Sequence, residues 1–316
     1  MKPSQPEIER AVELLRTGGV VAFPTETVYG LGADAENADA VRRVYAIKGR
    51  PPGHPVIVHV ADAEQLDVWA REIPQSARTL AQRFWPGPLT FVLKRTPRAS
   101  DMLTGGQDTV AVRAPSHPIA QEILRRFGGG VIAPSANRFG TVSATRAEHV
   151  AADLGSAVDL IVDGGPTTIG IESTIVDLTR DAPAILRPGA ITREQLAAAL
   201  GTPVRESGDS AVRVPGSLPS HYAPRARIVL ADDDRQGAVL ACALETSGRR
   251  FRLIGSEDVE KFARELYDRL READREGAEA IVVVLPPPTG LGIAVRDRLM
   301  RAAGAKPNEG SVRPRE

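Results

Sequence analysis

The sequence is poor in cysteine and aromatic residues and has no net charge. Its single cysteine, Cys242, excludes an internal disulfide and is typical of a reducing compartment, so we expect a cytoplasmic protein. Cys242 lies in the run AVLACALE, which predicts a helix with the thiol packed in the core. Forty basic and forty acidic residues cancel, so the overall charge favours neither a nucleic acid nor a membrane as partner. A local basic cleft is still consistent with this zero net charge.

Common targeting and ligand-binding motifs are also missing. The N-terminal segment MKPSQPEIER has no apolar core, and no stretch is long enough to cross a bilayer, so we expect no secretion signal and no membrane anchor. There is no G-x-x-x-x-G-K-[ST] loop, no G-x-G-x-x-G turn, no H-E-x-x-H helix and no cysteine pair. A nucleotide would therefore have to be held by side chains from separate segments, and no metal-ligating residues are predicted.

Short apolar runs between helical patterns predict an α/β fold. We expect strands at 20–23, 56–60 and 89–93, and others that begin near residues 109, 130, 160, 173 and 184. Several of these follow one another with only a loop between them, so the expected sheet is mixed and not purely parallel. Thr145 with Glu148, and Thr192 with Gln195, have the spacing of capping boxes and predict two helix starts.

The chain changes character after Gly201. Residues 204–226 contain several Pro, Ser and Gly and little apolar periodicity, so we expect a linker there, and its prolines suit an ordered lid. Residues 227–306 alternate strand and helix patterns and predict a small parallel β-α-β-α-β-α unit. The expected division is a first domain at 1–203, the linker or lid at 204–226, a second domain at 227–306 and a polar tail at 307–316.

Polar side chains follow several of the expected strands and one expected helix. These are Thr25 to Tyr29, Lys48 with Arg50, Arg113, Ser135 with Asn137, and Arg187. Loops at strand ends converge in α/β sheets, and a cluster of cations and hydroxyls suits an anion with several oxygens. Lys48 and Arg50 could instead cap the C-terminus of the helix that precedes them, so both interpretations stay open.

The ordered set of segments resembles the YrdC/Sua5 family. The matching segments are FPTETVYGLG, KGRPPGHPVIVHV, WPGPLTFVL, TVAVRAPSHPIA, APSANRFG, DGG with ESTIVD, and ILRPGAI, spread over residues 5–200. The linker segment VPGSLPSHYAPRA and the C-terminal unit resemble the longer, two-domain type. The resemblance implies a YrdC-like twisted mixed sheet with helices, joined by a long linker to a smaller Rossmann-like α/β domain.

The resemblance also implies an activity. Members of the family are L-threonylcarbamoyladenylate synthases, nucleotidyltransferases that combine L-threonine, bicarbonate or CO2, and ATP with Mg²⁺. They release pyrophosphate and threonylcarbamoyl-AMP for N6-threonylcarbamoyladenosine (t6A37) modification of tRNA. The implied partner is a downstream tRNA threonylcarbamoyl transferase, together with a weak contact to tRNA itself.

Roles for single residues follow from the same resemblance. Lys48 and Arg50 match a Lys-x-Arg element that binds the ATP phosphates, and they are the implied catalytic residues. The remaining implied ATP-side residues are His54, Thr109, Ser135, Asn137, Ser143, Arg187 and Tyr222, and the implied threonine-side residues are Thr27, His59, Arg113 and Ser173. His54 stands where many relatives have Asn, and both side chains donate a hydrogen bond.

Some residues keep two interpretations. The stretch 24–32 is expected to form a wall of the amino-acid pocket, with Gly30 and Gly32 letting backbone approach a ligand. His59 alternates with valines in its expected strand and so faces away from them, towards a cleft. Glu26 and Glu172 could contact Mg²⁺ through water or could be structural loop carboxylates.

Two other classes of function remain as alternatives. An RNA-binding module could use the same basic cleft, but the aromatic content of 4% leaves few residues for base stacking. A different acyl-adenylate or carbamoyl-transfer enzyme is the second, although such relatives usually carry zinc-finger-like cysteines and this chain has one cysteine.

Overall fold

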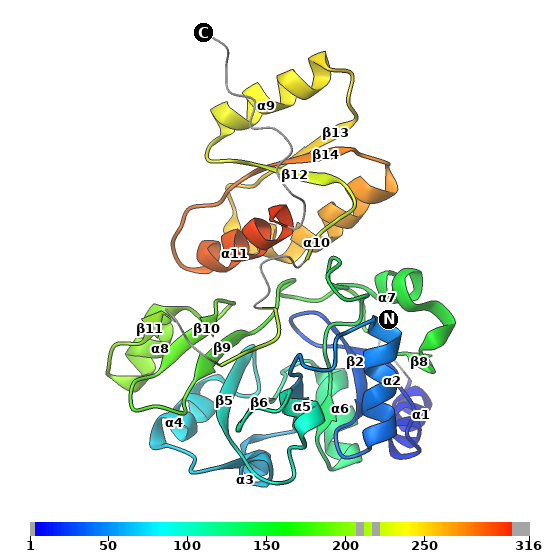
Figure 1. The fold of residues 1–316 in the computed structure, drawn as a ribbon, viewed down its shortest axis with the longest axis vertical. Coiled ribbons are helices and arrows are strands. Elements are labelled where there is room, and N and C mark those ends of the chain that lie inside the picture. The colour runs from blue at the N-terminus through cyan, green and yellow to red at the C-terminus, as the bar shows by residue number, and fades with distance from the viewer. Residues whose placement is uncertain (1–3, 207–211, 217–221, 305–316) are drawn as a thin grey trace.

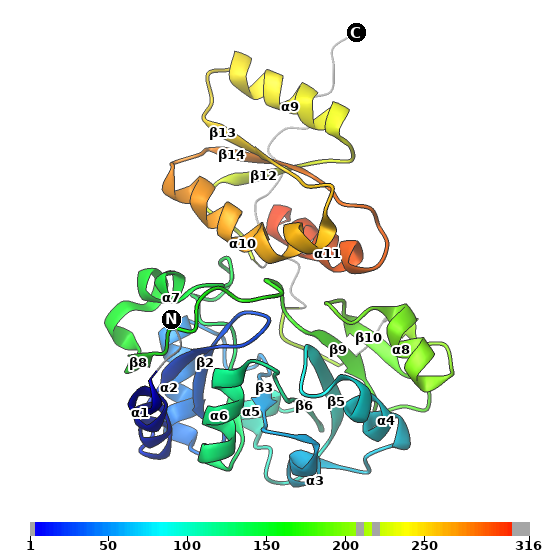
Figure 2. The same cartoon turned by 180° about the vertical axis from the view of Figure 1, so that it is seen from behind.

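The computed structural model describes residues 4–206, 212–216 and 222–304. Within these residues the chain forms a larger unit built on a mixed sheet and a smaller three-stranded unit that lies over one side of it (Figures 1 and 2). Parts of the expected linker, 207–211 and 217–221, and the expected tail lie outside the described residues. No described helix has both the length and the apolar character that a bilayer crossing requires.

The large sheet is mixed, as expected. Its described strands are β1 (Val21–Pro24), β2 (Tyr29–Asp34), β3 (Ile57–His59), β4 (Ala70–Arg71), β5 (Leu89–Arg95), β6 (Thr109–Arg113), β7 (Val131–Ile132), β8 (Leu160–Ile161), β9 (Thr174–Asp177), β10 (Ala184–Arg187) and β11 (Arg205–Glu206). They lie in the order β11-β10-β9-β5-β6-β3-β7-β2-β1-β8, with β4 on β5. Parallel pairs such as β3–β6 stand beside antiparallel pairs such as β5–β6. The expected linker thus begins with a short strand, β11.

Helices cover this sheet. They are α1 (Gln5–Arg16), α2 (Ala38–Lys48), α3 (Leu66–Trp69), α4 (Gln75–Phe84), α5 (Asp101–Thr104), α6 (Pro118–Phe127), α7 (Ala147–Leu154) and α8 (Arg193–Leu200), with 3₁₀ turns η1 (Ala63–Gln65) and η2 (Gly155–Ala157). Asn37 caps α2 by accepting from the amides of Asp39 and Ala40, and Gly49 ends it at φ +63°. This helix end brings Lys48 and Arg50 to a defined place at the edge of the sheet.

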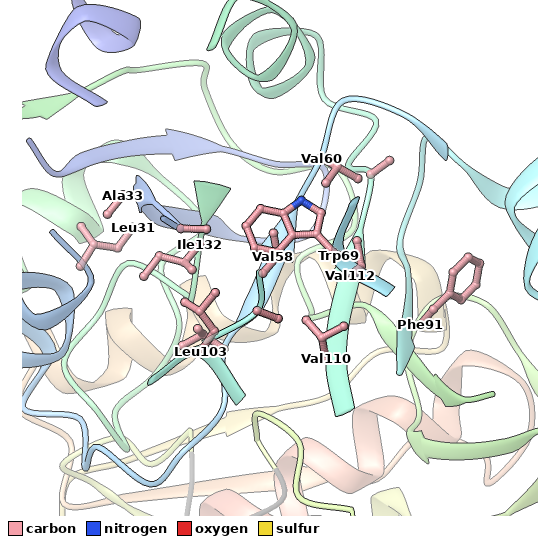
Figure 3. Packing of buried hydrophobic residues seen from close by; sticks show 14 of the residues in the cluster. Leu31, Ala33, Val58, Val60, Trp69, Phe91, Leu103, Val110, Val112 and Ile132 are labelled. Atoms are coloured by element: carbon pink, nitrogen blue, oxygen red, sulfur yellow. The ribbon is translucent and has the colours of Figure 1, made fainter. Parts of the chain in front are cut away.

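The core of the large unit lies between the central strands and the covering helices. Figure 3 shows Trp69 among Val58, Val60 and Val112, all buried. Each such side chain contributes roughly 1.5–3 kcal/mol by leaving water. A Cβ at Gly130 would lie 2.3 Å from Cζ2 of Trp69, so only glycine leaves room for the indole. This packing gives strands β3 and β6 fixed positions, and both carry predicted site residues at their ends.

Strand β2 was not expected from the sequence. Residues 29–34 pair with β1 in an antiparallel hairpin, with Phe23 opposite Gly30 and Pro24 opposite Tyr29. A Cβ at Gly32 would lie 2.5 Å from Cε1 of Phe23, and one at Gly30 would lie 2.9 Å from Cβ of Ala133. The expectation that these glycines admit a ligand is therefore wrong, because they admit neighbouring side chains of the sheet.

The smaller unit has the expected β-α-β-α-β-α order. Its elements are β12 (Arg227–Ala231), α9 (Asp234–Thr246), β13 (Phe251–Ile254), α10 (Val259–Arg275), β14 (Ala280–Val284) and α11 (Leu291–Ala303). The strands are parallel in the order β12-β14-β13. Helix α10 buries Phe262, Leu266 and Leu270, spaced four apart on one face. Helices α10 and α11 lie on the side of the larger unit, and α9 lies on the far side (Figures 1 and 2).

Two local predictions fail and one is confirmed. Cys242 is exposed and not in the core. Helix α9 covers one side of a small sheet, and the middle of this helix, where Cys242 lies, faces solvent. Thr145 does not cap α7, which begins at Ala147 with Arg146 as its N-cap. The amide of Thr145 instead donates to Nδ1 of His149. The capping box of Thr192 and Gln195 at the start of α8 is present as expected.

The two units share a hydrophobic core. Val28, Val142 and Ile171 of the larger unit pack in the same cluster as residues of α10 and α11. At Gly170, whose φ is +85°, a Cβ would lie 2.4 Å from Cα of Arg264, so α10 rests directly on this stretch of backbone. The smaller unit is therefore docked on the segment that leads into β9.

Candidate active site

A small buried cavity lies where the β1–β2 loop, the end of α2 and the loop after β7 meet the linker. Its free volume is about 50 Å³. The predicted site residues that line it are Thr27, Lys48, Arg50, His59, Arg113, Ser135, Asn137, Ser173, Arg187 and Tyr222. Segments far apart in the sequence thus meet at one place, as the polar strand ends indicated. The described lining residues include four Lys or Arg side chains and one carboxylate, Glu172, so the cavity suits an anion.

Three predicted site residues are not among the lining residues. Ser143 is one contact away, because its Oγ donates to Oε1 of Glu172 at 2.6 Å. The His54 ring lies 5.4 Å from the ring of Phe139, a lining residue that the sequence reading missed. Thr109 begins β6, and Arg113, which lines the cavity, ends it. Four residues of extended strand separate the two residues by about 13 Å. The structure therefore does not bring Thr109 to the cavity.

Lys48 and Arg50 are buried, and both donate to main-chain carbonyls outside α2. Lys48 Nζ lies 2.5 Å from the carbonyl of Ser135 and 2.6 Å from that of Asn137. Arg50 donates to the carbonyl of Pro55 at 2.6 Å, and Phe139 packs against its guanidinium. The helix-capping interpretation therefore loses its basis. Burial, and then the charge of Arg50, lower the pKa of Lys48 well below its usual range, and an anion beside it would raise this pKa again.

Arg113 is held by the β1–β2 loop. Its two terminal nitrogens donate to Thr27 Oγ1 at 3.0 Å and to Glu26 Oε1 at 2.6 Å, and its Nε donates to the carbonyl of Gly87. The other carboxylate oxygen of Glu26 accepts from the amide of Ser116. Glu26 is thus a structural carboxylate that orients Arg113, which favours the second of its two interpretations.

His59 is buried beside Arg113 and lines the cavity, and the strand alternation had predicted that it faces a cleft. Burial, and then the neighbouring positive charge of Arg113, lower the pKa of His59 to about 3. The imidazole is therefore neutral near pH 7. It can give or accept a hydrogen bond there, but it adds no charge to the cavity.

Arg187 connects β10, the segment before β9 and the linker. Its Nε and Nη2 donate to the carbonyl and Oγ of Ser173, each at 3.1 Å, and its Nη1 donates to the carbonyl of Pro215 at 3.0 Å. Ser173 Oγ also lies 2.8 Å from Thr90 Oγ1. The linker is thereby tied to the wall of the cavity.

The sequence reading missed two residues from the smaller unit, Tyr267 and Arg298. Tyr267 OH and Arg298 Nε each donate to Oε2 of Glu172 at 2.9 Å. Burial alone would raise the pKa of Glu172, but Arg298 and Arg187 outweigh it and lower this pKa to about 2. In the sequence, Arg298 looks like one more cation on an amphipathic helix, and no local pattern indicates that it is buried.

The described residues contain no group of three or more His, Cys, Asp and Glu side chains arranged to hold a metal ion. Glu26 and Glu172, the two carboxylates considered for Mg²⁺, are each paired with a buried arginine. Their oxygens are already occupied by protein donors, so these residues do not fit a protein-held metal.

A larger hollow of about 740 Å³ lies between α7 and α10. Its charges neutralise each other, since Arg271 pairs with Asp153 and Arg146 pairs with Asp268. The small cavity, with its excess of cations, is therefore the better candidate for chemistry.

The fold and this cavity define an α/β protein with a cation-rich cavity that is assembled from separate segments and has linker residues in its wall. A family model described as "Telomere recombination" matches residues 13–189, and one described as "Threonylcarbamoyl-AMP synthase, C-terminal domain" matches residues 191–304. The threonylcarbamoyl-AMP synthase of Bacillus subtilis is 42% identical and the match covers 97% of this chain and 95% of that one. The chain belongs to the Sua5/YrdC family, in its two-domain form.

A solved relative has the same fold. The crystal structure of Pyrococcus abyssi Sua5 complexed with L-threonine superposes with a TM-score of 0.88 at 41% identity and covers 94% of each chain. The curated Pyrococcus abyssi protein named threonylcarbamoyl-AMP synthase is 41% identical over 94% of this chain and 94% of that protein. The fold expected from the family resemblance is confirmed over both units.

The low pKa of His59 predicts acid sensitivity. Below pH 6.5 an ordinary histidine in the unfolded chain binds a proton, whereas His59 in the folded protein stays neutral. The free energy of unfolding therefore decreases as the pH is lowered from about 6.5 to about 3. Between pH 7 and pH 5 this loss amounts to about 2 kcal/mol. His59→Gln should therefore lose about 2 kcal/mol less unfolding free energy over this range in urea titrations. Equal losses in the wild type and His59→Gln would show that the pKa of His59 is not lowered by folding.

Proposed function

We propose that this chain is an L-threonylcarbamoyladenylate synthase, a nucleotidyltransferase. The observation that carries the proposal is the match over both units to proteins of that name, combined with a cation-rich cavity at the place where the family's segments meet. It produces threonylcarbamoyl-AMP and pyrophosphate from L-threonine, bicarbonate or CO2, and ATP.

The chemistry requires two anions to meet. The amine of threonine adds to CO2 to give a carbamate and a proton. One carbamate oxygen then attacks the α-phosphorus of ATP, a new P–O bond forms, and the bond to the β-phosphate oxygen breaks to release pyrophosphate. Positioned cations reduce the repulsion between the reactants and stabilise the leaving pyrophosphate, without a covalent intermediate on the protein.

The cavity offers separate groups for the two substrates. On the ATP side we assign Lys48 and Arg50 to the phosphates, where they act as catalytic residues. Ser135, Asn137, Ser143, Arg187 and Tyr222 complete this side, with His54 as an outer position. Asn137 Oδ1 is buried without a hydrogen-bond partner among the described residues, so it is available to accept from the nucleotide.

On the threonine side we assign Thr27, His59, Arg113 and Ser173. The guanidinium of Arg113, oriented by Glu26, suits the amino-acid carboxylate. The neutral ring of His59 lies beside it and can hydrogen-bond without repelling the amine. Mg²⁺ enters as part of the ATP complex, bound by phosphate oxygens and water, because the nearby carboxylates are already paired.

We also propose that the linker between domains 1–203 and 227–306 acts as a lid over the cavity. Small-molecule pockets measure roughly 300–1,000 Å³, so a free volume of about 50 Å³ does not admit ATP. Pro215, Gly216 and Tyr222 of the linker occupy the cavity wall, and Tyr222 is buried. These residues must withdraw for ATP to enter, and their return would exclude water from a product anhydride that hydrolyses readily.

The product needs a consumer. A mixed carbamic–phosphoric anhydride is an activated acyl donor, so we propose a tRNA threonylcarbamoyl transferase as the next enzyme, for t6A37, with both reactions in the cytoplasm. Direct tRNA binding would be weak. The tyrosines of the larger unit, Tyr29 and Tyr45, are buried, so they provide no surface on which bases could stack.

The first prediction concerns the reaction itself. Pyrophosphate release from ATP by the purified protein should require both L-threonine and bicarbonate, because the attacking oxygen belongs to the carbamate. A coupled pyrophosphate assay with each component omitted in turn measures this. Release that is indifferent to threonine would contradict the proposed function.

The second prediction concerns Arg50. If its guanidinium binds phosphate, Arg50→Ala should weaken ATP binding by roughly 1.5–3 kcal/mol, the range for hydrogen bonds to charged groups. Titration calorimetry should show a much smaller change for threonine alone. Arg98→Ala, which removes an exposed arginine paired with Glu36, is the matched control. Normal ATP affinity together with a lower melting temperature would limit Arg50 to a structural role.

The third prediction concerns Tyr222. Its ring packs in the wall of the cavity and its hydroxyl lies against Gly216, where a Cβ would come within 2.3 Å. Tyr222→Ala should lower the rate of adenylate formation at least about tenfold, or ~1.4 kcal/mol, because the cavity can no longer be closed. Tyr222→Phe keeps the ring and should retain more activity. A folded Tyr222→Ala protein with wild-type turnover would reduce the linker to a tether.

A further inference from the structure

The smaller unit reaches the site through one carboxylate, Glu172. This side chain lines the cavity, and it is held from three directions by Ser143, Tyr267 and Arg298. Two of these partners belong to α10 and α11 of the smaller unit. The neighbour of Glu172 in the chain is Ser173, which Arg187 holds against the linker. A group outside the catalytic fold thus sets the position of a wall of the cavity.

Arg298 uses its whole guanidinium at this junction. Its side chain is 0% exposed. Nε donates to Glu172 Oε2, Nη1 donates to the carbonyl of Pro188 and to Asp297 Oδ2, and Nη2 points to the carbonyl of Glu172 at 3.4 Å. Pro188 follows β10 directly. One side chain of α11 therefore fixes both the segment before β9 and the end of β10, the two segments that carry Ser173 and Arg187.

Tyr267 and Arg298 also hold Tyr222, the tyrosine of the linker. The Tyr222 ring stacks on the Tyr267 ring, with centroids 5.7 Å apart and planes 22° apart. The guanidinium carbon of Arg298 lies 5.5 Å from the centroid of Tyr222, within the range of a cation–π contact. The closed position of Tyr222 therefore depends on groups of the smaller unit.

We propose that Arg298, assisted by Tyr267, is a positioning residue for the synthase reaction: it holds Glu172 and the ring of Tyr222 in the arrangement that completes the site. The expected effect on kcat/KM rests on the proposed function, whereas the expected effect on the position of the linker rests on geometry alone. The smaller unit is then a part of the active-site wall, and its docking is a condition for closing the site.

Packing alone does not require this arrangement. An arginine–carboxylate pair removed from water gives little or no net stability relative to apolar residues of similar volume, whereas removal of one partner leaves a buried charge. A purely structural contact could therefore be replaced by a neutral pair. If Arg298 positions the site, a charge-balanced replacement restores stability and removes the pH effect described below, but it leaves Tyr222 without its cation.

The pH dependence separates the two roles. The titratable and charged groups that face Glu172 are Arg298 of α11, Tyr267 of α10, Arg187 of β10 and Tyr222 of the linker. With Arg298 present, the low pKa keeps Glu172 ionised throughout pH 5–9. Without it, burial is opposed chiefly by Arg187, so the pKa of Glu172 rises and the carboxylate gains a proton as pH falls. A new acidic limb then enters the pH–rate profile.

The experiment compares Arg298→Met, Glu172→Gln and the double variant, with Arg296→Met on the same helix as the control. Arg296 is a partly exposed neighbour that donates to the carbonyl of Pro286. We expect kcat/KM for threonine-dependent pyrophosphate release to fall at least tenfold in Arg298→Met at pH 8, and about tenfold more by pH 5. The double variant should lack the acidic limb, and Arg296→Met should follow the wild type.

A second readout is independent of the reaction. Hydrogen exchange of the linker amides of Tyr222, Ala223, Arg225 and Ala226 in the unliganded protein should be faster in Arg298→Met and in the double variant than in the wild type. If Arg298→Met does not fold, Arg298→Lys and Tyr267→Phe replace it. Each should give a smaller loss of kcat/KM and a smaller increase in exchange, because each removes only part of the contact.

The outcomes are distinct. A folded Arg298→Met protein with wild-type hydrogen exchange in the linker overturns the inference. The inference is also overturned if Arg298→Met loses the same fraction of kcat/KM at every pH and the loss persists when Glu172→Gln is added. Wild-type behaviour of both Arg298→Lys and Tyr267→Phe overturns it as well. Absence of threonine-dependent pyrophosphate release in the wild type defeats the proposed function, and hydrogen exchange then decides whether Arg298 holds the linker.

Discussion

The structure depends on how buried positive charge is compensated around one cavity. Lys48 and Arg50 come from the end of α2, Arg113 from the end of β6 and Arg187 from the end of β10, and each is nearly removed from water. Main-chain carbonyls satisfy Lys48 and Arg50, whereas carboxylates balance Arg113 and, through the Glu172 network, Arg187. Such an arrangement leaves a surplus of positive charge that a polyphosphate can neutralise. The folded protein without ligand therefore already holds the electrostatic conditions for binding an anion.

The same constraint bears on how the cavity is closed. Closing it removes these cations from water, and the linker limits that cost by placing the carbonyl of Pro215 on Arg187 and the ring of Tyr222 beside Arg298. Under the proposed function, ligand and linker would compete for Arg187, which here donates to the carbonyl of Pro215. A site of this kind binds substrate by exchanging protein contacts for substrate contacts, which favours a substrate that offers several strong acceptors over a single weak one.

The sequence predicted the larger features because they depend on local patterns. Apolar runs of strand length and the capping box of Thr192 follow the periodicity of their own segment, and the polar strand ends at Ser135 and Arg113 indicated where the cavity would form. Strand β2 was missed because its glycines read as a loop, while their real role is to admit Phe23 and Ala133 across the sheet. Thr145 was misplaced because its amide donates to His149 and Arg146 is the N-cap of α7, and Cys242 was misplaced because its place on α9 faces solvent. Arg298 lies 126 residues from its partner Glu172, and no local rule connects them.

The position of Arg298 suggests a division of labour between the two units. The larger unit supplies the groups that would touch substrate, and its sheet gives them fixed positions. The smaller unit contributes a buried arginine and a tyrosine that set one wall and the linker, together with apolar contacts behind Val28, Val142 and Ile171. Each of these three residues is a chain neighbour of Thr27, Ser143 or Glu172; Thr27 and Glu172 line the cavity, and Ser143 donates to Glu172. Packing of α10 and α11 therefore constrains the backbone beside the candidate site residues, so a unit that supplies none of the groups assigned to the substrates can control whether the site is assembled.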